Sequence, residues 1–88
     1  YDPRLPNDRR GAVANETVLT IDVAPLILDS VSLPIPESMQ GVSLRPCLLG
    51  EAKNWRTDFL YEHLLPIRTI PKCEGVRASR FKYVRYLL

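Results

Sequence analysis

Apolar residues recur at helical spacing in the first half of the chain and at strand spacing in the last third. The apolar positions of the first segment are Ile21, Ala24, Leu28 and Val31. This spacing is typical of one face of a helix and predicts a helix over residues 21–31. Thr20 or Asp22 is expected to cap its first turn, and Pro25 is tolerated because it lies near the start.

A second, shorter helix is predicted over residues 43–49. Ser43 would cap it, and Pro46 lies in its first turn, where the missing N–H costs little. Gly50 would close the helix, since glycine readily adopts the left-handed conformation found at helix ends.

Three segments of the first half are predicted to lack a helix. Residues 1–11 form a loop by composition, since prolines and turn-forming residues interrupt them. Residues 16–19 are β-prone but short. Pro34 and Pro36 exclude a helix from residues 32–40 and favour an extended linker.

Beyond Lys53 the period of the pattern changes from helical to two. The residues that would share one face of a strand are Trp55, Thr57, Phe59, Tyr61 and His63. Residues 74–77 and 81–88 predict two further strands, and the short connection between them implies an antiparallel hairpin. Helices followed by antiparallel strands indicate an α+β fold.

Aromatic and basic residues interleave over residues 80–86. Alternation would place Phe81 and Tyr83 on one face of a strand. A sheet that binds RNA needs several exposed aromatic side chains beside glycines that permit close approach, and this segment has no glycine. We therefore expect Phe81 and Tyr83 to be ordinary core residues, and we expect no nucleic-acid partner.

Length and composition limit the chain to one small globular domain or a piece of a larger one. It has 88 residues, of which 45% are hydrophobic and 25% are charged. No apolar run reaches the roughly 18–20 residues that a membrane span requires, so no span is expected. The chain opens on Tyr1 and ends on an apolar, strand-like run, which leads us to expect a segment of a longer protein.

The formal net charge of +2 conceals an asymmetry along the chain. Up to residue 65, six basic residues stand against nine acidic ones, a balance of −3. From Pro66 onward, six basic residues stand against Glu74 alone, a balance of +5. This surplus would favour an anionic partner. The alternative is a solvated strand face that meets acidic residues elsewhere in a larger protein.

Few residues of the chain could perform chemistry. His63 is the only imidazole, the four glycines stand apart, and no hydrolase motif surrounds a nucleophile. Cys47 and Cys73 are too few for a zinc site with one histidine; they are expected to be buried thiols, and a disulfide stays open as the alternative. We predict no catalytic residue and no metal ligand. His63 either forms a local hydrogen bond at the end of its strand or projects toward an anionic or hydroxylated substrate.

Six phrases of the sequence, taken in order, resemble the type I sulfatases of the alkaline phosphatase superfamily. They are residues 1–6, 21–29, 39–46, 55–63, 74–77 and 81–86. Their order and spacing are similar to the glycan-sulfatase branch, which includes N-acetylglucosamine-6-sulfatase-like enzymes. The resemblance implies that residues 1–52 close a large, alkaline-phosphatase-like α/β catalytic domain. Residues 53–88 would begin a smaller domain with an antiparallel sheet.

The resemblance also implies a chemistry whose residues lie outside this chain. Such enzymes use a formylglycine, made from Cys or Ser in a C-x-[PSA]-x-R motif, together with calcium held by Asp and Asn. Residues 73–77 spell C-x-G-x-R, but the third position is glycine and the segment lies late in the family pattern. The formylglycine and the calcium ligands are therefore expected upstream, and none is carried by this chain.

The resulting prediction is an inactive fragment of a sulfatase whose parent removes sulfate esters from a glycan. Its partners would be the remainder of the sulfatase chain and a sulfated carbohydrate. His63 is the first candidate for substrate contact and Arg77 is the second. The resemblance implies a periplasmic, secreted or lysosomal parent. The alternatives are a stand-alone basic module that binds anions or glycans, and an inactive homologue retained for structure.

Overall fold

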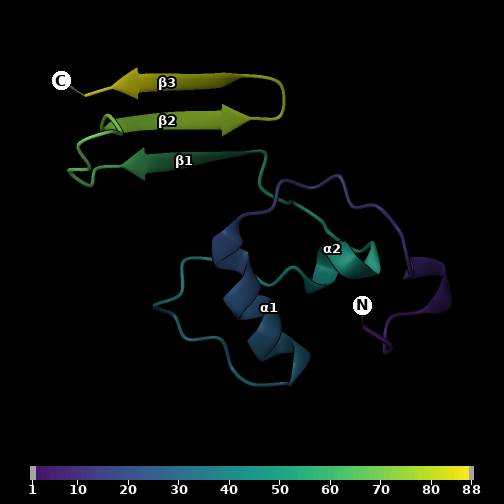
Figure 1. The fold of residues 1–88 in the computed structure, drawn as a ribbon. Coiled ribbons are helices and arrows are strands. Elements are labelled where there is room, and N and C mark those ends of the chain that lie inside the picture. Colours follow the sequence, from purple (N-terminus) through teal and green to yellow (C-terminus); the bar gives the residue numbers. More distant parts are fainter. Residues whose placement is uncertain (1, 88) are drawn as a thin grey trace. The chain divides into compact units, whose positions relative to one another are not determined.

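The computed structural model describes residues 2–87, and the chain divides into two compact units between Trp55 and Arg56. The first unit contains the helices, and the second is a three-stranded sheet (Figure 1). Helices followed by antiparallel strands are what the sequence pattern predicts. Within the described part of the chain, no helix has both the length and the apolar character needed to cross a membrane.

The first helix, α1, spans Val23–Ser30 and follows a 3₁₀ turn over Thr20–Asp22, which confirms the predicted helix. The predicted cap is confirmed in part: Asp22 caps the 3₁₀ turn that precedes α1, but no side chain caps the first turn of α1 itself. The carboxylate of Asp22 instead accepts hydrogen bonds from the backbone N–H of Leu19 at 2.8 Å and of Val42 at 3.0 Å. It therefore joins α1 to the segments on either side of it.

The buried side of α1 differs from the predicted one. Pro25 is fully buried, whereas Ile21 and Val31 of the predicted apolar face are 50% and 59% exposed. The segment that packs on the helix explains the difference, since Ser43 Oγ donates to Asp29 Oδ2 at 2.6 Å. A helix this short takes its buried side from the segment that packs on it, so its apolar period is a poor guide.

The second helix, α2, spans Arg45–Leu49 and ends at Gly50. Gly50 has a φ of 71°, the left-handed conformation expected of the closing residue. Ser43 lies two residues before the helix, and its hydroxyl accepts the Arg45 N–H at 3.2 Å. The predicted helix is therefore confirmed, with a start two residues later than expected.

Two side chains from elsewhere in the chain tie the first unit together. Arg9, in the 3₁₀ helix η1 (Asn7–Arg9), donates from Nε to the carbonyl of Leu48 at 3.0 Å, and so satisfies a carbonyl at the end of α2. The indole Nε1 of Trp55 donates to the carbonyl of Thr17 at 2.7 Å. Trp55 thus belongs to the helical unit, and its predicted place on a strand is wrong.

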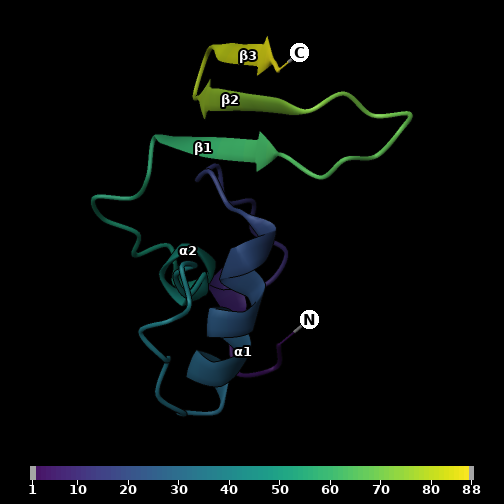
Figure 2. The ribbon, with the colours of Figure 1, turned by 90° about the vertical axis from the view of Figure 1, so that its left-hand side faces the viewer.

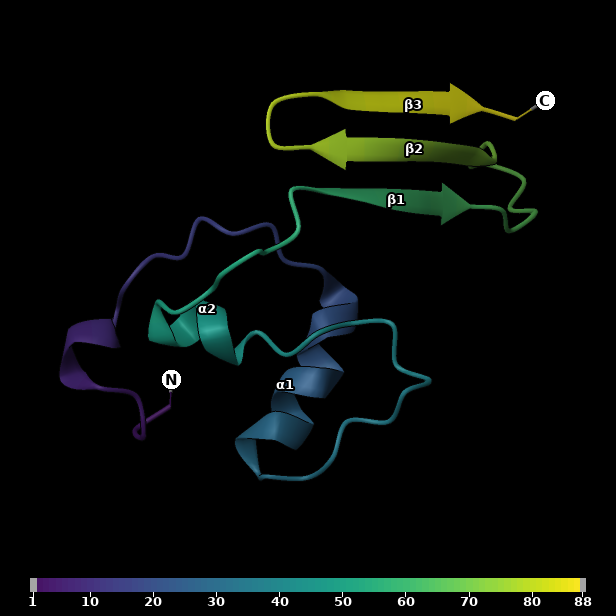
Figure 3. The ribbon, with the colours of Figure 1, turned by 180° about the vertical axis from the view of Figure 1, so that it is seen from behind.

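The second unit is an antiparallel sheet with the strand order β1-β2-β3. The strands are β1 (Asp58–His63), β2 (Cys73–Ala78) and β3 (Lys82–Tyr86). Figures 2 and 3 show them side by side from two further directions. Between β2 and β3 the Ala78 N–H donates to the Phe81 carbonyl at 2.8 Å. The antiparallel hairpin of β2 and β3 is therefore confirmed. The alternating pattern of the first strand starts at Trp55, but β1 itself begins at Asp58.

Residues 16–19, which are β-prone by sequence, form no strand, although Leu19 has an extended backbone with φ −120° and ψ 155°. The expectation that Phe81 and Tyr83 are core residues is wrong. Phe81 and Tyr83 are 71% and 66% exposed, so neither is a core residue among residues 2–87. Phe81 lies in the connection between β2 and β3, and Tyr83 lies on the outer strand, which explains their exposure.

Candidate functional site

His63 and Arg77, the two candidates for substrate contact, lie on the same face of the sheet but at opposite ends of it. In the β1–β2 pairing, His63 is opposite Cys73 and Phe59 is opposite Arg77. Directly opposed residues project to the same face, as do residues an even number apart along one strand. The two positions are separated by four residues of strand, about 13 Å at the usual rise. The structure therefore does not bring His63 and Arg77 together.

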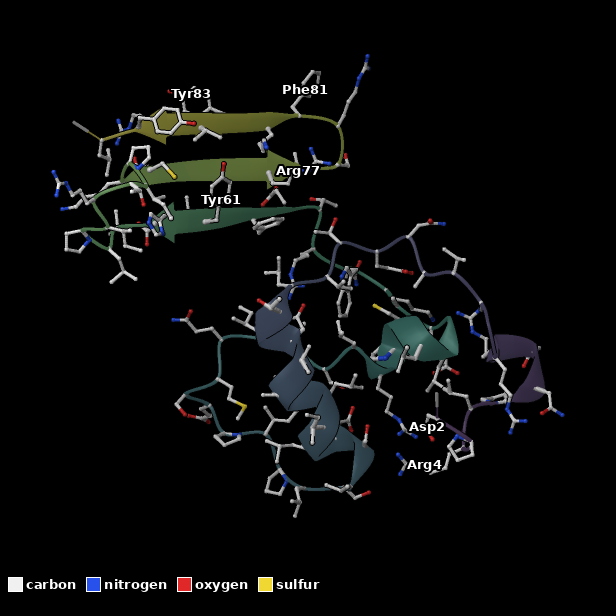
Figure 4. All side chains as sticks on the ribbon, viewed as in Figure 1. Asp2, Arg4, Tyr61, Arg77, Phe81 and Tyr83 are labelled. Atoms are coloured by element: carbon white, nitrogen blue, oxygen red, sulfur yellow. The ribbon has the colours of Figure 1, made fainter. Side chains whose placement is uncertain are left out.

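Tyr61 occupies the face between these two residues (Figure 4). It is opposite Gly75, and a β-carbon placed on that glycine would lie 2.6 Å from Tyr61 Cζ and Oη. The ring of Phe59 lies next to it, with the two ring centroids 6.3 Å apart. This face therefore presents aromatic surface between an imidazole at one end and a guanidinium at the other.

His63 is the last residue of β1, at the strand end where the sequence places it. Its Nε2 is buried and has no hydrogen-bond partner among residues 2–87. Buried polar atoms in folded proteins are almost always hydrogen-bonded. The local hydrogen bond considered from the sequence is thus absent at this nitrogen among residues 2–87.

Arg77 is exposed on β2 (Figure 4). The residue opposite it on β3 is Lys82, which is also exposed. Like charges directly opposite one another in a sheet repel. An anion bound near these two cations would relieve the repulsion. This end of the sheet is therefore suited to a negatively charged group.

The described residues form no metal centre. No group of three or more His, Cys, Asp or Glu within residues 2–87 could hold a metal ion. Cys73, which opens the C-x-G-x-R sequence, is a free, half-buried thiol opposite Tyr86 in the sheet. Cys47 is a buried thiol in α2, and the two cysteines form no disulfide. The expectation of buried thiols is confirmed for Cys47 and in part for Cys73.

A hollow that the sequence analysis missed lies at the loop between β1 and β2. It has a volume of about 770 Å³. Its lining includes four aliphatic and two basic side chains, those of Leu64, Ile67, Ile70, Leu87, Arg68 and Lys72. We call it the loop hollow. The signal in the sequence was an apolar loop interrupted by two prolines and free of acidic residues, since a solvated loop is normally more polar.

Known proteins similar to this chain are sulfatases. The chain is 40% identical over 72 residues to the extracellular sulfatase SULF-1 homolog of Drosophila melanogaster, a match that covers 70% of this chain and 6% of that protein. It is 28% identical over 83 residues to the N-acetylglucosamine-6-O-sulfatase of Bacteroides thetaiotaomicron, covering 89% of this chain and 15% of that protein. The chain therefore spans only a small part of the length of these relatives.

A solved structure and a family model agree with these matches. The structure of BT4656 in complex with its substrate D-glucosamine-2-N,6-O-disulfate is similar at a TM-score of 0.66 and 30% sequence identity, covering 74% of this chain and 14% of that chain. The model of the family described as N-sulphoglucosamine sulphohydrolase, C-terminal, matches residues 3–88. Because that match covers nearly the whole sequence, the chain belongs to this family and is a C-terminal-domain segment of a sulfatase.

Proposed function

We propose that the protein to which this chain belongs is a sulfatase that hydrolyses sulfate esters on a carbohydrate. The observation that carries the proposal is the family match over residues 3–88, which runs through both compact units. The names of the relatives favour a sulfated amino sugar, since one is an N-acetylglucosamine-6-O-sulfatase and BT4656 was solved with a glucosamine disulfate. The remainder of the sulfatase chain is the partner of this segment.

In this proposal, residues 1–52 close the alkaline-phosphatase-like catalytic domain and residues 53–88 begin the smaller domain. The division of the chain after Trp55 supports a boundary in this region, three residues beyond residue 52, because the helical unit ends there and the sheet unit follows. The two units would then serve different domains of one enzyme. The sheet unit would carry the substrate contacts.

Formylglycine and calcium, the groups implied for the parent enzyme, would be supplied by other parts of its chain. The described residues fit neither group, since no cluster among them could hold a metal ion and Cys73 is a paired strand residue in a C-x-G-x-R sequence. The role left to this segment is to bind and orient the substrate.

His63 and Arg77 are the residues proposed to contact that substrate. The Nε2 of His63 lacks a partner among residues 2–87 and would bond a hydroxyl or sulfate oxygen once the ring turns to expose this buried nitrogen. The exposed guanidinium of Arg77 suits a second, anionic group. Because about 13 Å of strand separates them, they would contact different groups of one ligand. The Tyr61 ring between them would face the sugar.

The experiment that tests the activity uses the full-length sulfatase that contains this chain. Sulfate released from N-acetylglucosamine 6-sulfate would be measured by ion chromatography, with the unsulfated sugar as the blank. We expect release by the full-length protein and none by residues 1–88 alone. A folded full-length protein that releases no sulfate from any sulfated sugar would contradict the proposal.

The roles of His63 and Arg77 are tested in the same protein by His63→Ala and Arg77→Ala. Each lost contact to a charged group is expected to lower kcat/KM by about tenfold. The control is Lys53→Ala, which removes an exposed cation in the segment before β1 and is expected to leave kcat/KM unchanged. Full activity in both single variants would remove these residues from the site.

The stand-alone basic module is the second candidate, and one observation favours it. All six basic residues of the last third are exposed: Arg68, Lys72, Arg77, Arg80, Lys82 and Arg85. Binding of the isolated chain to heparin, with an affinity that falls steeply with salt and with a cooperative thermal unfolding, would favour this function. Weak, salt-insensitive binding and a broad unfolding transition would favour the sulfatase segment.

A further inference from the structure

We infer that Asn15 is an attachment site for an asparagine-linked glycan. The inference concerns the helical unit and goes beyond the proposed sulfatase activity, on which it does not depend. Its evidence is a three-residue acceptor sequence, the exposure of the asparagine, the irregular backbone around it and the apolar side chains beside it.

Asn15, Glu16 and Thr17 form the sequence N-x-T, with a residue other than proline in the middle. This is the acceptor sequence for N-glycosylation, which occurs on surface loops of secreted proteins. The other asparagines of the chain are Asn7 and Asn54, and neither has a serine or threonine two residues after it. Asn15 is therefore the one asparagine of these 88 residues that has the required sequence.

The transfer of the glycan forms one bond and breaks one, with no change of oxidation state. The amide nitrogen of Asn15 attacks C1 of the first sugar of an oligosaccharide that is carried on a lipid pyrophosphate. The bond from C1 to the pyrophosphate oxygen breaks, the lipid pyrophosphate leaves, and the amide loses one proton to the transferase. The required partners are thus an oligosaccharyltransferase and its lipid-linked donor, which a chain meets when it enters the secretory pathway.

The side chain of Asn15 is available for this reaction. Asn15 is exposed, and within residues 2–87 its side chain has no hydrogen-bond partner. Residues 12–19, which lead to α1, contain no helix or strand (Figure 1). Residues 13–16 form no backbone–backbone hydrogen bond with any other described residue. The glycan would therefore be attached to an irregular surface segment, where a bulky group displaces no regular structure.

The contacts that hold this segment lie beyond Asn15 and do not use its side chain. The carbonyl of Thr17 accepts the indole N–H of Trp55 at 2.7 Å, and the Leu19 N–H donates to Asp22 Oδ2 at 2.8 Å. In the segment, both hydrogen bonds involve backbone atoms. A glycan on Asn15 would leave them in place, so the folded helical unit can carry it.

Two apolar side chains near Asn15 would be covered by such a glycan. Val13, two residues before it, is 82% exposed, and Val18, three residues after it, is 49% exposed. Removing apolar surface from water is favourable, and a sugar ring presents C–H groups that can cover it. The glycan would add polar surface in their place and keep this loop at the surface of the parent protein.

The test uses the full-length protein that contains this chain, secreted from cultured human cells. Peptide:N-glycosidase in water enriched with heavy oxygen converts a glycosylated asparagine into a labelled aspartate. Trypsin then releases residues 11–53, because it does not cut between Arg45 and Pro46, and Asn15 is the only asparagine of this peptide. We expect mass spectrometry to find the labelled form of the peptide, and no label when the glycosidase is left out.

Substitutions show whether the acceptor sequence is responsible. Asn15→Gln and Thr17→Ala should each lower the mass of the intact protein by one glycan. Thr17→Ser keeps the hydroxyl and should keep the glycan. Asn7→Gln is the matched control, since it changes an exposed asparagine outside any acceptor sequence and should leave the mass unchanged.

Two outcomes would overturn the inference. One is an unlabelled peptide 11–53 beside a co-secreted glycoprotein that is labelled in the same digest. The other is a label that persists in Thr17→Ala, since spontaneous deamidation would then explain it. If the protein is not secreted, the same peptide is measured in protein retained in the cells, where transfer has already taken place. No readout uses sulfate release, so the result is independent of the proposed function.

Discussion

The phenol ring of Tyr61 lies over Gly75, the residue opposite it in the neighbouring strand, so closely that the glycine has no room for a side chain. A β-carbon on Gly75 would lie 2.6 Å from Tyr61 Cζ and Oη and 2.5 Å from the carbonyl oxygen of Tyr83. Gly75 is also buried, at the centre of the pairing between β2 and its two neighbours. The sheet therefore depends on glycine at this position.

Gly75→Ala is expected to lower the free energy of unfolding by about 2 kcal/mol. The ring of Tyr61 can move aside, but the Tyr83 carbonyl belongs to the β3 backbone and can move only by distorting the β2–β3 pairing. Urea denaturation measures the effect. The control is Val76→Ala, at an exposed neighbouring position, which is expected to cost about 1 kcal/mol or less. A smaller loss in Gly75→Ala than in this control would contradict the close packing.

Asp22→Ala is expected to destabilise the helical unit by about 2–4 kcal/mol. The Asp22 side chain is fully buried and accepts from two backbone N–H groups, those of Leu19 and Val42, which would lose their acceptor. Asp22→Asn retains one acceptor oxygen and should cost about half as much. Amide hydrogen exchange at the two N–H groups measures the effect directly. Unchanged protection in Asp22→Ala would show that other groups hold these amides.

Gly41→Ala is expected to break the contact that brings Val42 to Asp22. A β-carbon on Gly41 would lie 2.0 Å from the carbonyl oxygen of Ile21, so the backbone must move apart. We expect the free energy of unfolding to fall by about 2 kcal/mol or more. In the double variant with Asp22→Ala, the fall should be smaller than the sum of the two single effects, because both substitutions remove the same contact. Gly11→Ala is the control. A β-carbon on Gly11 would meet no atom within 4 Å, and only its φ of 74° disfavours alanine, so a destabilisation of about 1 kcal/mol is expected. Full additivity would show that Gly41 and Asp22 act independently.

Features that depend on neighbouring residues could be predicted from the sequence, and features that depend on distant ones could not. The helix around Val23–Ser30 and the hairpin of β2 and β3 follow from local periodicity and turn length. The role of Asp22 depends on Val42, twenty residues away, and no periodicity encodes that contact. Trp55 fits the alternating pattern of a strand, yet its indole bonds Thr17 in the helical unit.

In the candidate site, too, some features follow from the local sequence pattern and others depend on contacts between distant residues. The place of His63 at the end of β1 follows from the strand pattern, which stops at that residue. The separation of His63 from Arg77 depends on the register between β1 and β2, and the long loop between these strands leaves the register open. The loop hollow was missed because its lining combines that loop with Leu87, which only the β2–β3 pairing brings beside Lys72.

The last prediction concerns the pH dependence of the pair Asp2 and Arg4. Arg4 donates from Nε to Asp2 Oδ1 at 3.0 Å, and its backbone N–H donates to the same oxygen at 2.9 Å. The side-chain hydrogen bond, followed by the backbone one, holds the pKa of Asp2 below its ordinary value of 3.8. The lowered pKa means that the small stabilisation from this pair is present above pH 3.8 and is lost as the pH falls through the folded-state pKa.

Arg4→Met should raise the pKa of Asp2 toward 3.8 but not fully, because the backbone hydrogen bond to the carboxylate survives the substitution. A pH titration followed by NMR of the Asp2 carboxyl carbon measures the shift. Lys53→Met, which removes a distant cation, should leave the pKa of Asp2 where it is. Arg4→Met also removes the hydrogen bond that Arg4 donates to the Ser30 carbonyl at 2.6 Å. The amides at the end of α1 should therefore exchange faster in this variant. An unchanged Asp2 pKa in Arg4→Met would mean that the backbone hydrogen bond alone sets its value.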